Sequence, residues 1–303
     1  MIKWILIAGL VAMVGWLGWS GLTSDIQAPS SAAPLASQDP ASAKRDEQET
    51  ASSRRPVRIN SLRIAFEQSN DLSAFVRSLS ARAAAGDADA LWLISRSVDY
   101  CTTYGKNPAA FTSVTKILLA NAPPEAVHSI KTVRERTAAR CRGFIASNDG
   151  NVFSSSAALA NKVRAARAGS LPAEAALLLA KAPLSTDSAY LTNLVDRVQH
   201  SGDPEAYLAI SDAMGTMASG HEKIFGSNSG SEISTFAWQL AACRRGLDCS
   251  PTGSLMSMYC LHGGICGNFS SFEDLVFRGL APESDKTRIN AMVNRITSRG
   301  DIL

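Results

Sequence analysis

Two cysteine loops, Cys243-Arg-Arg-Gly-Leu-Asp-Cys249 and Cys260-Leu-His-Gly-Gly-Ile-Cys266, indicate most of what can be expected of the fold. They hold four of the six cysteines of this chain. In each loop an apolar helical stripe leads to the first cysteine, and a glycine follows where the chain must turn back. Closely spaced cysteines become structural disulfides in an oxidising compartment. The loops therefore predict a helical domain that is stapled by disulfides and lies outside the cytoplasm.

A hydrophobic N-terminal stretch indicates the same location. Residues 4–22 carry no charge, and a helix of that length spans roughly 28 Å, close to the hydrocarbon thickness of a bilayer. Lys3 precedes the stretch and Asp25 is the first charge after it. Because positive charge stays on the cytoplasmic side, we predict that residues 1–23 anchor the chain in the inner membrane, with the domain in the periplasm. A cleaved signal peptide is the alternative, although its apolar core is usually shorter.

Residues 24–57 have the composition of a spacer. They are rich in Ser, Ala, Pro and charge, with almost nothing large to bury. Such a segment cannot offset the entropy lost on ordering, so we predict a disordered linker. Residues 58–303 then form the helical extracytoplasmic domain.

Helical periodicity runs through this domain, and no alternating strand pattern persists for long. We therefore expect an all-α fold of about ten helices in an antiparallel array, stapled by disulfides, behind an N-terminal transmembrane helix. One helix should begin at Pro124 and carry an apolar stripe that reaches Phe144 and Ile145. Another should follow a capping box formed by Ser229 and Glu232.

Two stretches of the domain repeat a pattern. Gly86-Asp-Ala-Asp-Ala-Leu-Trp-Leu-Ile-Ser95 lines up with Gly202-Asp-Pro-Glu-Ala-Tyr-Leu-Ala-Ile-Ser211. In both, the glycine should end one helix and the aspartate should cap the next, with an acidic residue in the first turn. Repeated joints of this kind indicate a partly repeat-like α-α array.

The first joint, with Ala83 to Ala85 before it and Ile94 and Tyr100 beyond it, resembles the joint of Sel1-type tetratricopeptide-like repeats. That family stacks helix pairs into superhelices that bind other proteins, so the resemblance implies an α-α array with a protein or peptide partner. The glycine-rich turn between the two helices of the family, and its regular period, are missing from this chain. The cysteine-rich tail is similar to envelope proteins of gamma-proteobacteria, which imply no activity.

The cysteines can pair in more than one way. Cys101 and Cys141 lie on the apolar stripes of their own helices, so a bridge between them in the core is expected. The four tail cysteines allow three connectivities, and their spacing alone does not choose among them. The glycines favour the local pairs, Cys243–Cys249 and Cys260–Cys266. The crossed pairs, Cys243–Cys260 and Cys249–Cys266, remain open.

The cysteine spacing and the net charge do not favour metal or nucleic-acid binding. Zinc sites usually place two to four residues between cysteines, and the five in each loop are a wide spacing, so we predict no metal and no cofactor. The formal net charge of +3 is small and its signs are mixed along the chain. Because nucleic-acid binding needs a concentrated basic face, we predict no nucleic-acid partner.

The best candidate for catalysis is the pair His221 and Glu222, in the long glycine- and serine-rich stretch from Gly215 to Ser231. Long loops often carry function, and these two side chains can act as acid and base. Adjacent residues point apart on a helix, however, and no nucleophile motif accompanies the pair. We therefore do not predict an enzyme.

The function expected from these patterns is binding. We expect a membrane-anchored periplasmic module that binds or scaffolds protein or peptide partners, with residues 4–22 in the inner membrane. One alternative is an envelope hydrolase that uses His221 and Glu222. The other is a helical domain that holds a hydrophobic ligand in a groove between helices.

Overall fold

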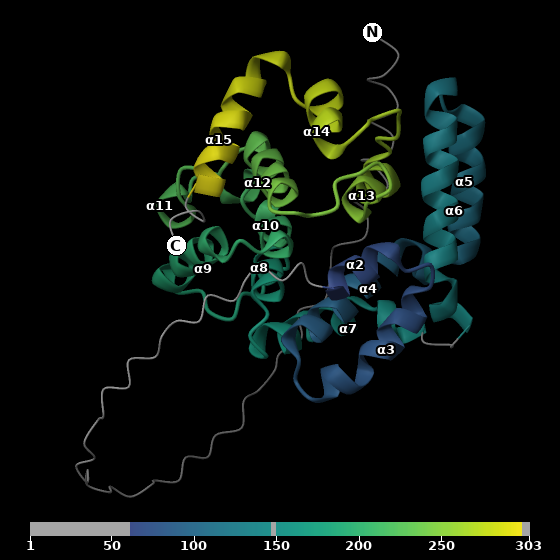
Figure 1. Ribbon diagram of the computed structural model, residues 1–303, viewed down its shortest axis with the longest axis horizontal. Coiled ribbons are helices and arrows are strands. Elements are labelled where there is room, and N and C mark those ends of the chain that lie inside the picture. The colour runs from purple at the N-terminus through teal and green to yellow at the C-terminus, as the bar shows by residue number, and fades with distance from the viewer. Residues whose placement is uncertain (1–60, 147–149, 299–303) are drawn as a thin grey trace, which may run out of the picture. The chain divides into compact units, whose positions relative to one another are not determined.

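A computed structural model describes residues 61–146 and 150–298 of the chain (Figure 1). Within these ranges the protein is all-helical and contains no β-strand, which confirms the predicted fold class. No helix among the described residues is both long enough and apolar enough to cross a membrane. The predicted anchor at residues 1–23 and the predicted linker at residues 24–57 lie outside the described residues.

Fourteen α-helices lie in the described ranges, more than the ten or so expected, because very short helices interrupt several loops. The first six are α2 (Ser61–Gln68), α3 (Leu72–Ala84), α4 (Ala88–Lys106), α5 (Pro108–Asn121), α6 (Pro124–Ala146) and α7 (Ser155–Arg167). The other eight are α8 (Leu171–Leu179), α9 (Ser188–Ser201), α10 (Pro204–Ser211), α11 (Glu222–Phe225), α12 (Glu232–Arg244), α13 (Ser254–Gly263), α14 (Phe272–Leu275) and α15 (Lys286–Ser298).

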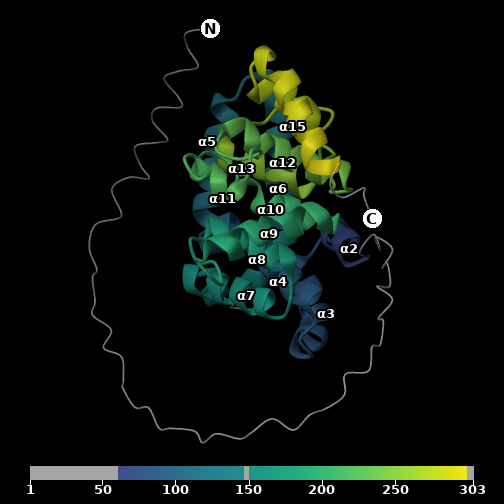
Figure 2. The same ribbon diagram turned by 90° about the vertical axis from the view of Figure 1, so that its left-hand side faces the viewer.

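A continuous row of packed helices organises the domain. Each member packs on the next in the order α3, α4, α7, α8, α10, α12 and α15. Figure 2 shows α12, α10, α8 and α7 one below another. Helices α5 and α6 form a separate pair that stands side by side in Figure 1, and α6 joins the pair to α3, α4 and α13.

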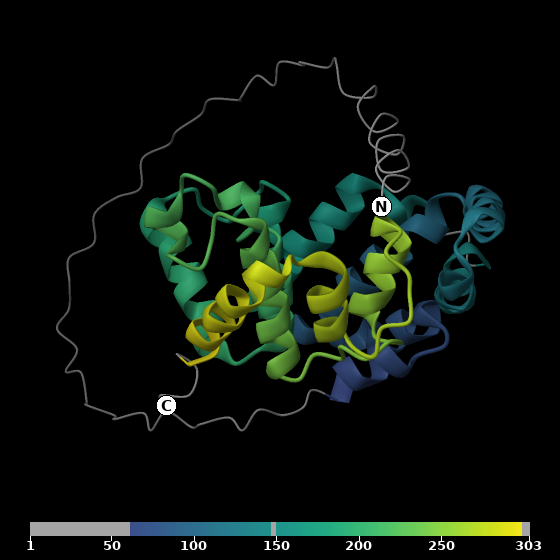
Figure 3. The same cartoon turned by 90° about the horizontal axis from the view of Figure 1, so that it is seen from above.

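Two large clusters of buried side chains form the core. The N-terminal cluster contains Phe66, Trp92 and Cys101, and the C-terminal cluster contains Tyr207 and Trp238. Seen from above in Figure 3, the blue N-terminal helices and the green helices of the C-terminal half lie at opposite ends. The row of helices therefore carries one core region at each end.

The two repeated joints adopt the expected conformation. Gly86 and Gly202 have φ angles of +82° and +61°, in the left-handed region that favours glycine. The Asp87 carboxylate accepts hydrogen bonds from the backbone N–H groups at the start of α4, and Asp203 does the same for α10. Aspartate caps of this kind satisfy backbone donors that the helix leaves unpaired. The predicted glycine turn and aspartate cap at each joint are confirmed.

Two details of the predicted helices are wrong. Helix α12 begins at Glu232 itself, so Ser229 does not form a capping box with it; the Ser229 hydroxyl donates to the Gly226 carbonyl instead. Ile145 is 38% exposed, whereas its neighbour Phe144 is buried. Successive residues are turned about 100° around a helix, so Ile145 lies at the edge of the stripe that buries Phe144.

Candidate functional site

A cleft of about 430 Å³ opens between α4, α7, α8, α10, α12 and α13, and we call it the main cleft. It lies where residues far apart in the chain meet, from Trp92 on α4 to Ile265 after α13. Its lining is mostly apolar, and the apolar residues are Trp92, Ala176, Leu179, Leu208, Ala209, Leu255, Met258 and Ile265. A mostly apolar cleft with a few polar groups is the usual form of a ligand site.

Helical periodicity divides α10 between the core and the main cleft. Tyr207 and Ile210 are fully buried in the C-terminal cluster. Leu208 and Ala209 are half-buried and line the cleft. Side chains one residue apart point in different directions on a helix, so a short apolar run such as Tyr207 to Ile210 can serve both surfaces.

Ion pairs neutralise the two cationic side chains of the main cleft. The Lys162 ammonium on α7 lies 2.7 Å from the Asp99 carboxylate on α4. Arg96, which is 9% exposed, donates through Nε to the buried Glu205 carboxylate at 3.2 Å. Neither cation therefore attracts an anionic ligand strongly.

The Glu205 carboxylate anchors a buried polar network behind the cleft wall. Trp92 Nε1 donates to the same Glu205 oxygen at 3.2 Å. Arg96 Nη2 donates to the Ser254 hydroxyl at 3.1 Å, at the start of α13. Three walls of the cleft, α4, α10 and α13, are thus joined by hydrogen bonds, which hold the cleft in one shape. Sequence reasoning found only that Glu205 lies in the first turn of a helix.

Tyr259 and Asp212 form the polar part of the main cleft at its α10–α13 side. The Tyr259 hydroxyl donates to Gln239 Oε1 at 2.6 Å. Burial, and then the charge of Asp212, raise the pKa of the Tyr259 phenol. The surrounding cleft wall partly desolvates the Asp212 carboxyl and raises its pKa, although the residue remains exposed at the rim. Within the described part of the chain, no hydrogen bond or ion pair engages this carboxylate.

His262 lies at the same rim, on the last turn of α13. Its ring is exposed and contacts the Thr103 hydroxyl at 3.4 Å. Desolvation lowers the pKa of the imidazole from its ordinary value of 6.5. The ring is therefore neutral at pH 7 and adds no charge to the cleft.

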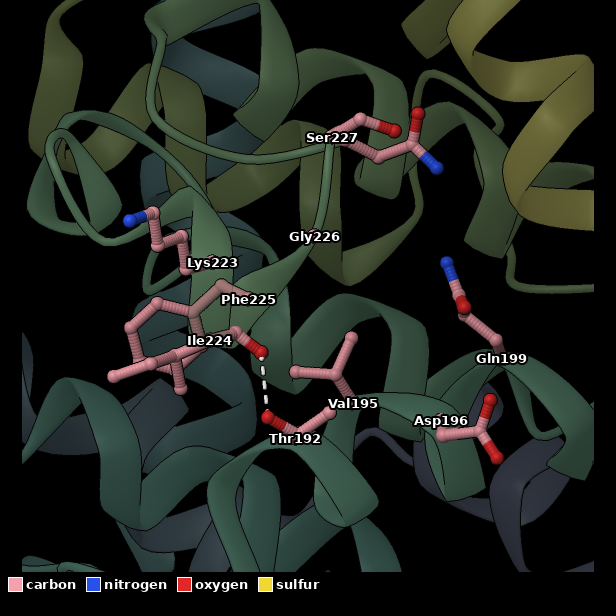
Figure 4. A pocket seen from close by; sticks show the side chains of 10 residues that line it. Thr192, Val195, Asp196, Gln199, Lys223, Ile224, Phe225, Gly226 and Ser227 are labelled. Atoms are coloured by element: carbon pink, nitrogen blue, oxygen red, sulfur yellow. Dashed lines mark hydrogen bonds between the residues drawn. The ribbon is translucent and has the colours of Figure 1, made fainter. Parts of the chain in front are cut away.

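A second cleft, of about 140 Å³, lies between α9 and the segment that contains α11 (Figure 4). The Thr192 hydroxyl donates to the Ile224 carbonyl at 3.0 Å and closes one side of it. Asp196 and Gln199 on α9 line it, and Figure 4 shows the Gln199 side chain pointing towards the chain that follows Phe225. The space is too small for more than a few atoms, so the main cleft is the better candidate for a ligand.

The predicted catalytic pair lies on the surface. His221 is the N-cap residue of α11, Glu222 is its first residue, and both are exposed. Neither residue lines the main cleft or the smaller cleft beside α9. Backbone N–H groups of Glu222 itself and of Gly220 lower the pKa of the Glu222 carboxyl. A carboxyl with a lowered pKa holds no proton at neutral pH and is a weaker base, so this placement does not favour acid–base catalysis.

All six cysteines form disulfides, which confirms the predicted disulfide-stapled domain. Cys101 pairs with Cys141 in the core, at a Cα–Cα distance of 5.4 Å. The tail adopts the local connectivity, and its pairs are Cys243–Cys249 and Cys260–Cys266. The second of these bonds closes the loop that carries Ile265 into the main cleft.

The described residues contain no cluster of three or more His, Cys, Asp or Glu side chains placed to hold a metal ion. Comparison with protein families, with curated proteins and with solved structures finds no match to this chain. The main cleft and its lining residues therefore provide the basis for a functional assignment.

Proposed function

We propose that this protein is a binding module whose main cleft takes an apolar segment of a protein or peptide partner. The observation that carries the proposal is the mostly apolar, preformed cleft between six helices. Leu179 illustrates its character, because this leucine lines the cleft and yet remains 44% exposed. Covering such surface removes apolar area from water, a gain of about 25 cal/mol per Å² that offsets the entropy cost of association.

The arrangement of the helices supports a repeat-like α-α array as the scaffold of this cleft. The joints at Asp87 and Asp203 share one capping geometry, and both lead into helices that line the cleft. Stacked helix pairs form superhelices with an extended concave face for partners. Kinship with Sel1-type tetratricopeptide-like repeats is therefore part of the proposal.

We also propose the location inferred from the sequence, with residues 4–22 in the inner membrane and the domain in the periplasm. Three disulfides among the described residues support an oxidising compartment. Maleimide labelling of the denatured, unreduced protein from cells should find no free thiol. A periplasmic reporter fused after Leu303 should be active, and activity only of a cytoplasmic reporter would contradict this location.

Two leucines of similar exposure provide a matched test of the main cleft. Leu179 lines it at 44% exposure, whereas Leu184 is 41% exposed and lies outside it. The full-length protein is titrated with the neutral apolar dye Nile red. Leu179→Glu should weaken dye binding at least tenfold, since it places a charge in the cleft, and Leu184→Glu should leave it unchanged. Equal affinity of the two variants for Nile red would contradict the main cleft as the binding site.

The peptide partner is tested in cells with a photoreactive side chain at the same two positions. A benzophenone residue at 179 should give a discrete cross-linked adduct, and Nile red should compete with it. The same group at 184 should give no adduct. Dye binding without any adduct at 179 would favour the alternative of a small hydrophobic ligand.

A further inference from the structure

We propose that the occupant of the main cleft is a peptide segment that carries a lysine or arginine beside its apolar side chains, and that Asp212 binds this cation. The inference rests on the proposed function of the cleft and adds the chemical class of the ligand. It is carried by one unpaired carboxylate in a cleft whose other charges are neutralised.

Among the described residues that line the cleft, the pairing of the charged groups leaves only Asp212 available. Arg96 is bound to Glu205, and Lys162 is bound to Asp99. Burial alone accounts for the raised pKa of the Asp212 carboxyl, and no neighbouring cation lowers that pKa. The cleft therefore presents one uncompensated negative charge, which complements a single positive charge on a ligand.

A second acidic residue strengthens the negative potential at this end of the cleft. The pKa of the Tyr259 phenol is raised by burial, then by the charge of Asp212, and further by that of Glu232. No cationic side chain contributes to the shift of this phenol. Both carboxylates therefore favour a cation in the part of the cleft that Tyr259 and Asp212 line.

The position of Asp212 in its helix disfavours a purely structural role. Asp212 is the C-cap residue of α10, where the helix dipole places partial negative charge. A carboxylate at a helix C-terminus is repelled by that charge, and here no ion pair compensates for it. A bound ammonium or guanidinium group would relieve both the repulsion and the incomplete solvation.

The experiment uses two ligands that differ only in charge, hexylammonium and 1-hexanol. The full-length protein is labelled with ¹³C in its methionine methyl groups, and the signal of Met258, which lines the cleft, reports binding. Asp212→Asn removes the carboxylate with little change of shape. Glu135→Gln on α6 is the control, since it removes an exposed carboxylate that lies outside the cleft.

In the wild type, hexylammonium should bind about tenfold more tightly than 1-hexanol, the effect expected for one charge-assisted hydrogen bond. In Asp212→Asn the ratio should fall to about one, with 1-hexanol binding unchanged, which also shows that the variant is folded. In Glu135→Gln the ratio should stay near ten. These outcomes together support the assignment of Asp212.

The contrary outcomes separate the two proposals. Equal affinity for the two ligands in the wild type, or a tenfold preference that persists in Asp212→Asn, overturns the role of Asp212 and leaves the apolar cleft standing. If neither ligand shifts the Met258 signal, the proposed function of the cleft fails and the inference fails with it.

Discussion

The carboxylate of Glu67 caps a helix that begins 187 residues later in the chain, at Ser254. The backbone N–H of Ser254 donates to Glu67 at 3.0 Å, and the Ser254 hydroxyl donates to its other oxygen at 2.5 Å. The N-cap residue of α13 is Gly253, which has no side chain to offer. Helix α2 therefore supplies the anion that the N-terminus of α13 favours, and it fixes one wall of the main cleft.

Removing this cap should destabilise the domain. Glu67→Ala leaves the N-terminus of α13 uncapped and the Ser254 hydroxyl without its acceptor, at a cost of about 2 kcal/mol in the free energy of unfolding. Gln68→Ala is the control, because Gln68 is the next residue of α2 and is exposed. Urea unfolding of the two variants measures the difference, and equal stabilities would show that the cap contributes nothing.

Glu67 should also make stability depend on pH. Burial raises the pKa of its carboxyl above the ordinary value of 4.5, although the hydrogen bond from Ser254 lowers it. Between the pKa of the unfolded chain, near 4.5, and the higher pKa of the folded protein, the folded protein holds the proton more tightly. Rising pH in this window therefore reduces the free energy of unfolding. Relative to Glu67→Gln, the wild type should therefore lose stability from pH 4.5 upward and level off above the folded pKa. A difference that grows with pH would contradict a raised pKa.

Asp212→Asn should stabilise the unliganded protein. The substitution removes a negative charge from the C-terminus of α10 and breaks no ion pair, so the free energy of unfolding should rise by about 0.5 kcal/mol. Differential scanning calorimetry without added ligand detects this as a higher melting temperature. A lower melting temperature would contradict this prediction, because it would mean that the Asp212 carboxylate makes a stabilising contact in the unliganded protein.

The disulfides should contribute unequally to stability. Cys101 and Cys141 are 40 residues apart, and the chain-entropy model assigns a bond across such a loop about 4 kcal/mol. Cys260 and Cys266 are 6 residues apart, which corresponds to about 2.4 kcal/mol. Chemical unfolding of the two double Cys→Ala variants tests this order. If the loss of the Cys260–Cys266 bond destabilises the protein more, the packing of the short loop that carries Ile265 contributes more to stability than the entropy of loop closure.

Local features of the fold could be predicted because short-range chemistry controls them. The caps at Asp87 and Asp203 follow from a glycine and an aspartate in sequence, and the structure confirms both. The cysteine stripes placed Cys101 and Cys141 in the core for the same kind of reason. The error at Ser229 also has a local cause, since two serines compete to precede Glu232 and the helix begins after the second one.

The candidate site could not be predicted from the sequence, because its residues meet only when distant helices pack. Nothing in the local sequence around Asp212 distinguishes it from a solvated residue at the end of a helix. Its character depends on Tyr259, and on the fact that no cation in the described ranges pairs with it. The sequence analysis selected His221 and Glu222 instead because they lie in a long loop. The length of a loop can be read from the sequence, whereas the burial of a side chain cannot.

The sequence by itself determined that the domain is helical, where the helices after Asp87 and Asp203 begin, and that its cysteines form disulfides. Periodicity, capping and loop closure act over a few residues, so they can be read in order along the chain. Only the tertiary structure decided that Glu67 reaches Ser254, that Glu205 joins Trp92 to Arg96, and that a cleft remains between the helices. These relations join residues more than 100 positions apart, and the packing of whole helices sets them.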